Sequence, residues 1–419
     1  MRILLVHQNF PGQFRNLAPA LARDPANQVV GFGMREYSGA APIRMVRYEI
    51  GRQSSPTIHP WVAELEAKVI RGEAAYRAAL ALKAEGFSPD VIYAHPSWGE
   101  SIFLKDVWPA ARLILYCEFF YHHRGADVGF DPEFADPDPD IACRLRMKNA
   151  NNLLNLDIAD GGVSPTYWQR DTYPDSVRRR IDVIHDGIDT VRLRPDPQKR
   201  VAVEVGQDTG LPPGAPVPRQ RIVLGRDDEV ISFVNRNLEP YRGYHIFMRA
   251  LPEILRRRPR AHVLIVGGFD VSYGTRPPAG TTWRDVFLDE VKDKLDRSRV
   301  HFLGYLPYET YVSVLQLSTV HVYLTYPFVV SWSLLEAMSC GCAIVASDTA
   351  PVREMIVDGE TGRLVDFFAT DRLASAVDEL LGDAAARRRL GENARAFACD
   401  RYDLERVCLP QQIAYLLRR

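Results

Sequence analysis

Residues 331–348 read SWSLLEAMSCGCAIVASD, a helix-forming run followed by a short apolar strand. Glu336 stands in the middle of this run among apolar and small residues, and nothing cationic lies near it in the sequence. If a helix starts near Ser333, Glu336 lies one turn inside it, and the amides of Ser331, Trp332 and Ser333 are its free N-terminal donors. Glu336 is then either an acid that complements the helix dipole or a hydrogen-bond acceptor held for a ligand.

The same alternation of short apolar strands and amphipathic segments extends in both directions along the chain. It is typical of parallel sheets with crossover helices, so we predict an α/β fold with two doubly wound, Rossmann-like domains. The predicted helices include 61–86, 243–258 and 371–381. The predicted strands are 2–6, 28–32, 43–48, 91–94, 113–117, 158–163 and 181–184 in the first half, and 230–234, 262–266, 300–303, 320–324 and 343–346 in the second.

A change in composition marks the predicted domain boundary. Residues 195–226 are rich in Pro, Gly and Arg and show no apolar periodicity, so we expect a linker or loop there. We therefore predict an N-terminal domain at 1–194, a C-terminal domain at 195–400, and a terminal helix at 401–419, which could pack back on the first domain but which the sequence alone does not place. Open parallel sheets bind ligands at the carboxyl ends of their strands, which places the expected ligand in the cleft between the domains.

Bulk composition narrows the function classes. The 419 residues carry 52 Lys plus Arg against 53 Asp plus Glu, so no global field recruits nucleic acid. No apolar run is long enough to span a bilayer, and the N-terminus has a strand pattern without a cleavable signal, so we expect a cytoplasmic protein. The six scattered cysteines lack metal-ligand spacing, and we expect reduced, buried thiols.

Three loops after predicted strands carry candidate ligand-binding residues. In HQNFPGQF, Gly12 lets the backbone approach a ligand at a helix start, although Pro-Gly is most often only a turn. In RNLEPYRG, Arg236 and Arg242 flank a turn and can bind phosphate oxygens, or be ordinary solvated arginines. In VHFLGYLPYETYVSVL, the backbone of Gly304, Tyr305 and Leu306 could read the edge of a base, and a simple strand-to-helix turn explains the residues equally well.

The order of these motifs along the chain is similar to that of a known enzyme family. That order is a strand-Gly loop, a linker, R-x5-R-G, L-G-Y-L-P, LLEAMSCGCAIVASD and PVREMIVDGETGRLV. In the order of its motifs, the chain resembles the retaining glycosyltransferases of the GT-B fold, in particular family 4. The resemblance covers nearly the whole chain and is strongest over 230–365. It implies two Rossmann-like domains facing across a cleft, with the acceptor on the N-terminal side and the nucleotide sugar on the C-terminal side.

The resemblance also implies roles for individual residues. Arg236 and Arg242 correspond to the basic pair that binds the donor diphosphate, and Glu336 to the acid that holds the ribose hydroxyls. The helix N-terminal amides at 331–333 correspond to a phosphate cradle. Because two arginines and helix amides stabilise the leaving diphosphate, no metal and no cofactor beyond the nucleotide-sugar substrate is expected. In the mechanism inferred for this fold, the departing phosphate oxygen accepts the acceptor's proton, so no protein nucleophile is needed.

The chain departs from the family pattern in two places. Phe328 stands eight residues before Glu336, where the E-x7-E pattern has a glutamate tied to donor-sugar hydroxyls, and Ser331 replaces the usual glycine. Glu118 in YCEFFYHH stands near the place of a family histidine, and His95 in YAHPSW is a second candidate near the reacting sugar. A lone loop histidine is more often structural.

The prediction is a retaining glycosyltransferase of polysaccharide biosynthesis that moves a sugar from a nucleotide sugar to a glycan or lipid-linked acceptor. A lipid-linked acceptor would bring the protein to the membrane periphery; the oligomeric state is open. The long aromatic and acidic loop at 121–141 could bind acceptor hydroxyls or be a solvated loop, and a metal site from His122, His123 and Asp127 is the less favoured alternative. The rival functions are a sugar-nucleotide epimerase of the same fold and a non-catalytic nucleotide-sugar or glycan-binding protein.

Overall fold

The computed structural model describes residues 1–206 and 219–418, which form two compact units. Unit 1 comprises Met1–Gly129, Ala135–Gly187 and Leu404–Arg419, and unit 2 comprises Phe130–Phe134 and Ile188–Asp403. The units therefore divide after residues 187 and 403, where the sequence patterns placed the boundaries at 194 and 400. A short segment of the first half, Phe130–Phe134, belongs to unit 2, which the sequence analysis did not foresee.

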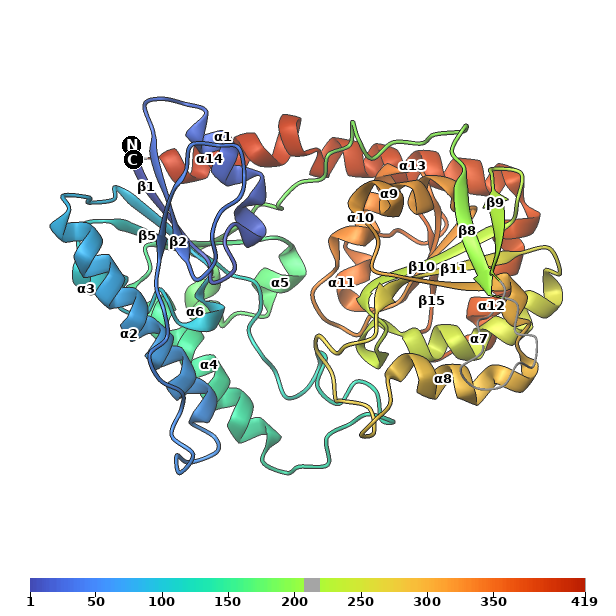
Figure 1. Cartoon of the computed structure of the whole chain (residues 1–419), viewed down its shortest axis with the longest axis horizontal. Helices are drawn as coiled ribbons and strands as arrows, with labels where there is room; N and C mark the ends of the chain where they lie inside the picture. The colour runs from blue at the N-terminus through green and yellow to red at the C-terminus, as the bar shows by residue number, and fades with distance from the viewer. Residues whose placement is uncertain (207–218, 419) are drawn as a thin grey trace. The chain divides into compact units, whose positions relative to one another are not determined.

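Among the described residues, unit 1 is built on a seven-stranded parallel sheet with the order β3-β2-β1-β4-β5-β6-β7 (Figure 1). Its strands are β1 (Arg2–Val6), β2 (Gln28–Gly33), β3 (Arg44–Arg47), β4 (Val91–Ala94), β5 (Arg112–Tyr116), β6 (Gly161–Ser164) and β7 (Ile181–Val183). Its helices are α1 (Leu17–Ala22), α2 (Ala63–Ala84), α3 (Leu104–Val107), α4 (Ile141–Ile158), α5 (Tyr167–Asp171), α6 (Asp175–Arg178) and α14 (Leu409–Leu417). The strand predicted at 158–163 begins only at Gly161, because α4 continues to Ile158.

Unit 2 has a six-stranded parallel sheet with the order β12-β11-β10-β13-β14-β15 in the described part of the chain. Its strands are β10 (Val230–Asn237), β11 (His262–Gly268), β12 (Val300–Gly304), β13 (Val320–Tyr323), β14 (Ala343–Ser347) and β15 (Arg363–Val365), the last of which was not predicted. Its helices are α7 (Tyr244–Arg257), α8 (Trp283–Val291), α9 (Tyr308–Leu317), α10 (Trp332–Ser339), α11 (Ala350–Arg353), α12 (Thr370–Gly382) and α13 (Ala384–Tyr402).

The expectation of a linker without regular structure at 195–226 is wrong in part. Strands β8 (Val201–Gly206) and β9 (Arg219–Leu224) pair antiparallel within this stretch. Val201, Val203 and Leu224 are buried in a core cluster of unit 2. Alternation of apolar residues over so few positions is a weak signal beside the many prolines and glycines, which explains why it was missed. Residues 207–218 lie outside the described part.

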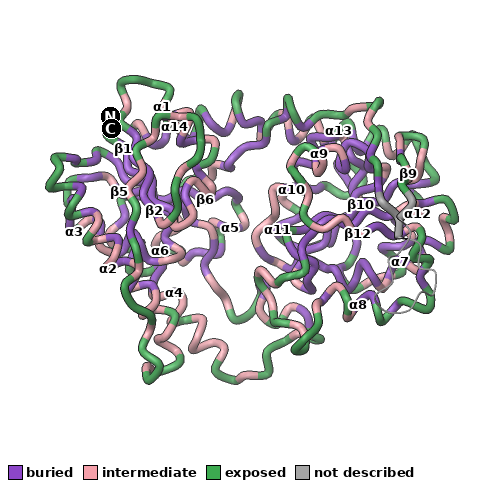
Figure 2. The backbone as a smooth tube through the Cα atoms, in the orientation of Figure 1, coloured by how far each residue is buried: buried purple, intermediate pink, exposed green. Residues whose placement is uncertain are grey.

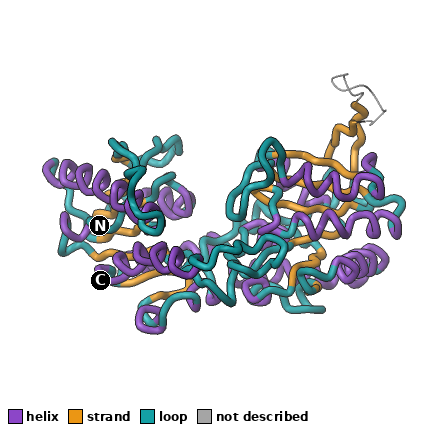
Figure 3. The backbone as a smooth tube through the Cα atoms, turned by 90° about the horizontal axis from the view of Figure 1, so that it is seen from below, coloured by secondary structure: helices purple, strands orange, loops and turns teal. Residues whose placement is uncertain are grey.

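The sheet of unit 2 is buried on both faces, as near-continuous apolar strands require. Ile231 and Phe233 of β10 point into the cluster that contains α7, α8 and α12, whereas Val230 and Val234 point into the one that contains α9, α10 and α13. Figure 2 shows the sheet strands buried, and Figure 3 shows helices lying over them. A fully buried side chain of this size contributes roughly 1.5 to 3 kcal/mol, so these two layers hold the strand ends in place.

The C-terminal tail, which the sequence alone did not place, belongs to unit 1. A π-helical turn at Leu404–Cys408 leads into α14, and the Tyr415 hydroxyl donates to the carbonyl of Gly162 at 3.1 Å. The guanidinium of Arg112 donates to the carbonyls of Tyr415 and Leu416. These bonds satisfy the last carbonyls of α14, which no residue inside the helix can do. No helix in the described residues has the length and apolar character needed to cross a membrane.

Candidate active site

The first candidate cluster lies at the carboxyl ends of neighbouring strands in unit 1. His95 directly follows β4, and Glu118 comes two residues after β5. His95 Nε2 lies 3.4 Å from Glu118 Oε2; the imidazole is fully buried, while the Glu118 side chain is 34% exposed. The structure therefore brings together two residues that the sequence analysis named separately. A buried base beside a partly exposed carboxylate can move a proton at the surface of the unit.

His7 completes this cluster and was not predicted. It follows β1, the strand next to β4, and its ring centroid lies 5.3 Å from that of His95. Its Nε2 lies 2.7 Å from Gln13 Oε1, and its Nδ1 accepts a hydrogen bond from the Asn9 amide at 2.9 Å. Burial, followed by the neighbouring His95, lowers the pKa of His7 to about 3, so the ring is neutral at pH 7. Its position directly after a strand was the available signal.

Gly12 has a structural reason to be glycine. Its φ is +49°, and a Cβ there would lie 2.3 Å from the His7 imidazole. The structure thus explains Gly12 by its contact with His7, whereas the sequence analysis explained it by the approach of a ligand. The two explanations do not exclude each other. A side chain at position 12 would displace His7 and would thereby also disturb the cluster around His95.

The two arginines of RNLEPYRG lie in different environments. Arg236 is exposed on β10. Arg242 ends a 3-10 turn (Pro240–Arg242) and is buried. Its Nη1 donates to Thr325 Oγ1 at 2.9 Å and to the Val329 carbonyl at 2.8 Å. The two arginines therefore differ in desolvation, which was not visible in the sequence.

Aromatic faces surround the Arg242 guanidinium. Its Cζ lies 5.0 Å from the ring centroid of Tyr273 and 5.7 Å from that of Phe328. Phe328 is the residue that stands where the resemblance described above implies a glutamate, and its ring lies near the arginine at this position. Among the described residues no carboxylate makes a direct ion pair with Arg242, although the charge of buried Glu239 acts on it. A desolvated cation of this kind attracts anions strongly.

Glu239, which the sequence analysis did not single out, holds the loop that carries Tyr273. It is buried, and its Oε2 accepts hydrogen bonds from the amides of Ser272, Tyr273 and Gly274 at 3.0, 3.1 and 3.4 Å. Burial raises the pKa of Glu239, and these amides act in the opposite direction. The carboxylate thereby fixes one wall of the Arg242 environment.

Glu336 is buried in α10 and accepts two hydrogen bonds from α9. Tyr308 Oη donates to Oε1 at 3.0 Å, and Tyr311 Oη donates to Oε2. Burial and then the charge of Glu336 raise the pKa of Tyr311 well above its ordinary value, so this phenol stays a donor. The hydroxyls of α9 therefore orient both oxygens of this buried acid. The tyrosines sit three residues apart, on one face of α9, which the sequence alone could have shown.

The helix N-terminus differs from the expectation. Helix α10 begins at Trp332, and Ser331 is its N-cap. The Ser331 amide donates to the Tyr323 hydroxyl at 2.8 Å, and the Ser333 amide donates to Ser331 Oγ at 3.3 Å. The expectation of free donor amides at Ser331 and Ser333 is therefore wrong, because the Tyr323 hydroxyl accepts from the first and the side chain of the serine N-cap accepts from the second.

The predicted base-edge residues lie at the end of β12. Gly304 has φ +63°, and a Cβ added there would meet open space, so its glycine serves the backbone conformation. Tyr305 is 69% exposed and donates from its hydroxyl to Asn237 Oδ1 at 2.6 Å, while Leu306 packs against a core cluster of unit 2. These contacts hold the turn across the ends of β10 and β12.

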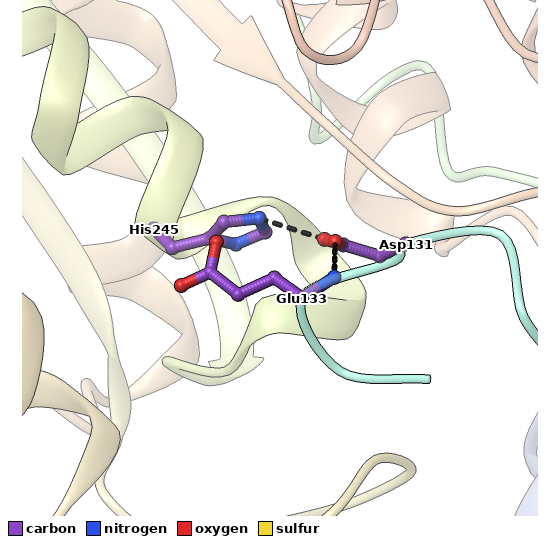
Figure 4. Close-up of side chains that lie close together, drawn as sticks. All are labelled: Asp131, Glu133 and His245. Atoms are coloured by element: carbon purple, nitrogen blue, oxygen red, sulfur yellow. Dashed lines mark hydrogen bonds and ion pairs between the residues drawn. The ribbon is translucent and has the colours of Figure 1, made fainter. Parts of the chain in front are cut away.

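Asp131, Glu133 and His245 form a compact group within unit 2 (Figure 4). The three offer donor atoms of a kind that metals accept, all within 4.8 Å of one another. However, Arg249 already binds both oxygens of Glu133, at 2.7 Å each, and its positive charge opposes a cation. We therefore describe the group as an ion-pair network. The weaker metal alternative at His122 differs as well, since its Nε2 lies 2.6 Å from the Thr172 carbonyl oxygen.

Comparison with known proteins places the chain in a family. The model of the Glycosyl transferase family 4 group matches residues 25–193, and that of the Glycosyl transferases group 1 matches residues 218–397. The D-inositol 3-phosphate glycosyltransferase of Nocardia farcinica is 34% identical over 224 residues, 53% of this chain and 44% of that protein. The GDP-mannose-dependent alpha-(1-6)-phosphatidylinositol monomannoside mannosyltransferase of Mycolicibacterium smegmatis is 28% identical over 53% of this chain and 52% of that protein. The chain thus spans about half the length of the curated relatives it matches.

Solved structures show the same fold over the whole chain. Sucrose-phosphate synthase from Thermosynechococcus elongatus matches with a TM-score of 0.69 at 18% identity, covering 99% of this chain and 98% of that one. Anabaena Alr3699/HepE in complex with UDP and glucose matches with a TM-score of 0.63 at 16% identity, covering 100% and 99%. With the two parallel sheets and both family matches, the chain belongs to the group 1 glycosyltransferases and has the GT-B fold.

Proposed function

We propose that the protein transfers a sugar from a nucleotide-sugar donor to a glycan or lipid-linked acceptor, with retention at the anomeric carbon. The observation that carries this proposal is Arg242, a buried cation whose close partners are a hydroxyl, a carbonyl and two aromatic faces. A diphosphate leaving group would supply negative charge in direct contact with Arg242, beyond the charge of buried Glu239 that already acts on it. In this assignment Arg236 is the second, exposed cation, and Glu336 binds the ribose hydroxyls.

The reaction proposed here needs no protein nucleophile. The bond between the anomeric carbon and the phosphate oxygen breaks, the acceptor oxygen bonds to the anomeric carbon, and the acceptor's proton moves to the departing phosphate. Arg242 stabilises the charge that grows on the diphosphate, so the reaction as proposed requires no metal ion. The expected setting is cytoplasmic polysaccharide biosynthesis, with the membrane periphery as the site for a lipid-linked acceptor.

Relatives and neighbours narrow the donors worth testing. The curated relatives include a GDP-mannose-dependent enzyme, and the Anabaena structures contain UDP, glucose and UDP-glucose. We expect one of GDP-mannose and UDP-glucose to raise the melting temperature, since a ligand present at 100 times its Kd stabilises by about 2.7 kcal/mol. The measurement is a thermal-shift panel of both sugars with UDP and GDP. If no nucleotide or nucleotide sugar in the panel stabilises the protein, the proposal is wrong.

One observation favours a second candidate, a sugar-nucleotide epimerase. Such an enzyme needs acid and base groups in its site, and His7, His95 and Glu118 supply an imidazole pair beside a carboxylate. The epimerase would convert its donor without any acceptor, whereas the transferase consumes the donor faster when an acceptor is added. Product analysis with and without acceptor separates the two.

The first-unit cluster yields a prediction of its own. Glu118→Gln and His95→Ala should each lower transfer more than they lower UDP or GDP affinity, because we assign both residues to the sugar and acceptor side of the reaction. Misplacing a reacting group by about 1 Å can cost about 10²-fold in rate, which sets the expected scale. Transfer rate and nucleotide affinity are measured on the same preparations, with Glu85→Gln, an exposed acid of unit 1, as the control. Equal losses in rate and affinity would instead assign the pair a structural role.

A further inference from the structure

Residues Phe130–Phe134, named here the anchor segment, pack in unit 2 although the chain on either side of them belongs to unit 1. The Phe130 ring lies 5.1 Å from that of Tyr326, and the Phe134 ring lies 5.3 Å from that of Trp283. Both phenylalanines pack against the core cluster of α7, α8 and α12. Two aromatic side chains thus hold the ends of the anchor segment in the core of unit 2.

Asp131 follows Phe130 in the anchor segment and is buried. Figure 4 shows its side chain beside those of Glu133 and His245. Its Oδ2 accepts a hydrogen bond from the Tyr326 hydroxyl at 2.8 Å and lies 2.9 Å from His245 Nε2. Its Oδ1 accepts from the Glu133 amide at 3.0 Å. Burial acts to raise the pKa of Asp131, but the hydrogen bonds from His245 and Tyr326 keep it below its ordinary value. The carboxylate is therefore ionised, and a charged acceptor binds the Tyr326 hydroxyl strongly.

Tyr326 belongs to the loop that holds Arg242. Its own amide donates to the Tyr241 carbonyl at 3.1 Å, and the two rings lie 4.7 Å apart. The preceding residue, Thr325, supplies the hydroxyl that accepts from Arg242. Two consecutive loop residues therefore hold two consecutive residues of the arginine turn, so a shift of Tyr326 moves Tyr241 and Arg242 together.

We infer that Asp131 is a positioning residue for Arg242 and acts through the Tyr326 hydroxyl. This inference rests on the proposed function, because it takes Arg242 as the group that binds the diphosphate. It adds that a residue from the long loop after β5 sets the geometry of a site built on β10 and β13. The segment is thus more than a solvated connection, one of the two alternatives raised for residues 121–141.

Asp131→Asn keeps the shape of the side chain but removes its charge. We expect kcat for sugar transfer to fall by about 10- to 100-fold, measured with the nucleotide sugar that stabilises the wild type. Misplacing a catalytic group by about 1 Å can cost about 10²-fold in rate. Glu133→Gln is the matched control on the same segment: it breaks the exposed pair with Arg249, leaves the Asp131–Tyr326 bond intact, and should stay within about 2-fold of wild type. Both variants are measured for kcat, KM, UDP and GDP affinity, and melting temperature.

A double-mutant cycle separates positioning from general stability. If Asp131 acts through the Tyr326 hydroxyl, Tyr326→Phe should lower kcat similarly, and adding Asp131→Asn in that background should cost nothing more. Additive losses, or wild-type kcat in Asp131→Asn, would overturn the inference. If Asp131→Asn does not fold, Tyr326→Phe alone tests the inference, because this variant retains the ring packing. A reduced kcat at a normal melting temperature then supports the inference, and a wild-type kcat overturns it.

Two further outcomes complete the test. If Arg242→Ala removes nucleotide binding while Asp131→Asn changes nothing, the positioning role fails and the proposed function stands; if Arg242→Ala also changes nothing, the proposed function fails as well. Equilibrium dialysis against Zn²⁺ tests whether Asp131, Glu133 and His245 bind a metal ion instead. Zinc retained by the wild type and lost in His245→Gln would overturn the ion-pair assignment of Asp131.

Discussion

Arg242→Ala should lower kcat for sugar transfer by about 10²- to 10³-fold at saturating donor, the usual cost of removing one preorganised donor to developing charge. The reason is that Arg242 is buried and, among the described residues, makes no direct ion pair, so its attraction for a diphosphate is little screened by water. A contact that strengthens in the transition state appears in kcat, whereas uniform binding appears mainly in KM. Steady-state kinetics with the donor identified by thermal shift are the measurement.

Two variants sharpen this test. Arg242→Lys keeps the charge but loses the planar fork that donates to Thr325 and Val329, so it should retain part of the activity. Arg256→Ala, on the exposed side of α7, removes an arginine that pairs only with Glu253 in the described structure and should leave kcat unchanged. Arg236→Ala is expected to cost less than Arg242→Ala, because exposed charges are screened by water. Wild-type turnover in a folded Arg242→Ala variant would show that the diphosphate is bound elsewhere.

The second large effect concerns nucleotide affinity. Glu336→Gln should raise the Kd for the nucleoside diphosphate by about 10- to 150-fold, which corresponds to the roughly 1.5 to 3 kcal/mol of hydrogen bonds to a charged group. The carboxylate is held by Tyr308 and Tyr311, so its direction is fixed before the ligand arrives. Calorimetric titration with UDP and GDP measures the change, and the melting temperature checks the fold.

A matched control for Glu336 lies on α9, the helix whose tyrosines donate to Glu336. Glu309→Gln alters an exposed acid that pairs with Arg192, and the nucleotide Kd should not change. Tyr311→Phe provides an independent check, since it removes one donor to Glu336 without touching the acid. We expect a smaller rise in Kd than for Glu336→Gln. An unchanged Kd in a folded Glu336→Gln variant would remove this residue from the nucleotide site.

Much of the fold could be predicted because local patterns report burial. Most strands of the two sheets appear as short runs of Val, Ile and Leu, and such runs must be covered on both faces. The errors lie where the local signal is weak. Strands β8 and β9 are short and stand in a stretch rich in prolines and glycines, and β15 covers only Arg363–Val365.

For the candidate site, too, the sequence predicted what local patterns can show. From the sequence alone, Glu336 stood out as an acid in an apolar run, Arg236 and Arg242 as cations after a strand, and His95 and Glu118 as polar residues at strand ends. These are local observations. They name which residues carry chemistry, but not which atoms meet.

Tertiary structure decided the partners, because sheet order and loop packing join residues far apart in the chain. The order β1-β4-β5 places His7 beside His95 and His95 beside Glu118. Burial distinguished Arg242 from Arg236, although both lie in one short motif. The contact of Asp131 with Tyr326 spans 195 residues of sequence, and no local pattern can encode a hydrogen bond that depends on where a distant loop is packed.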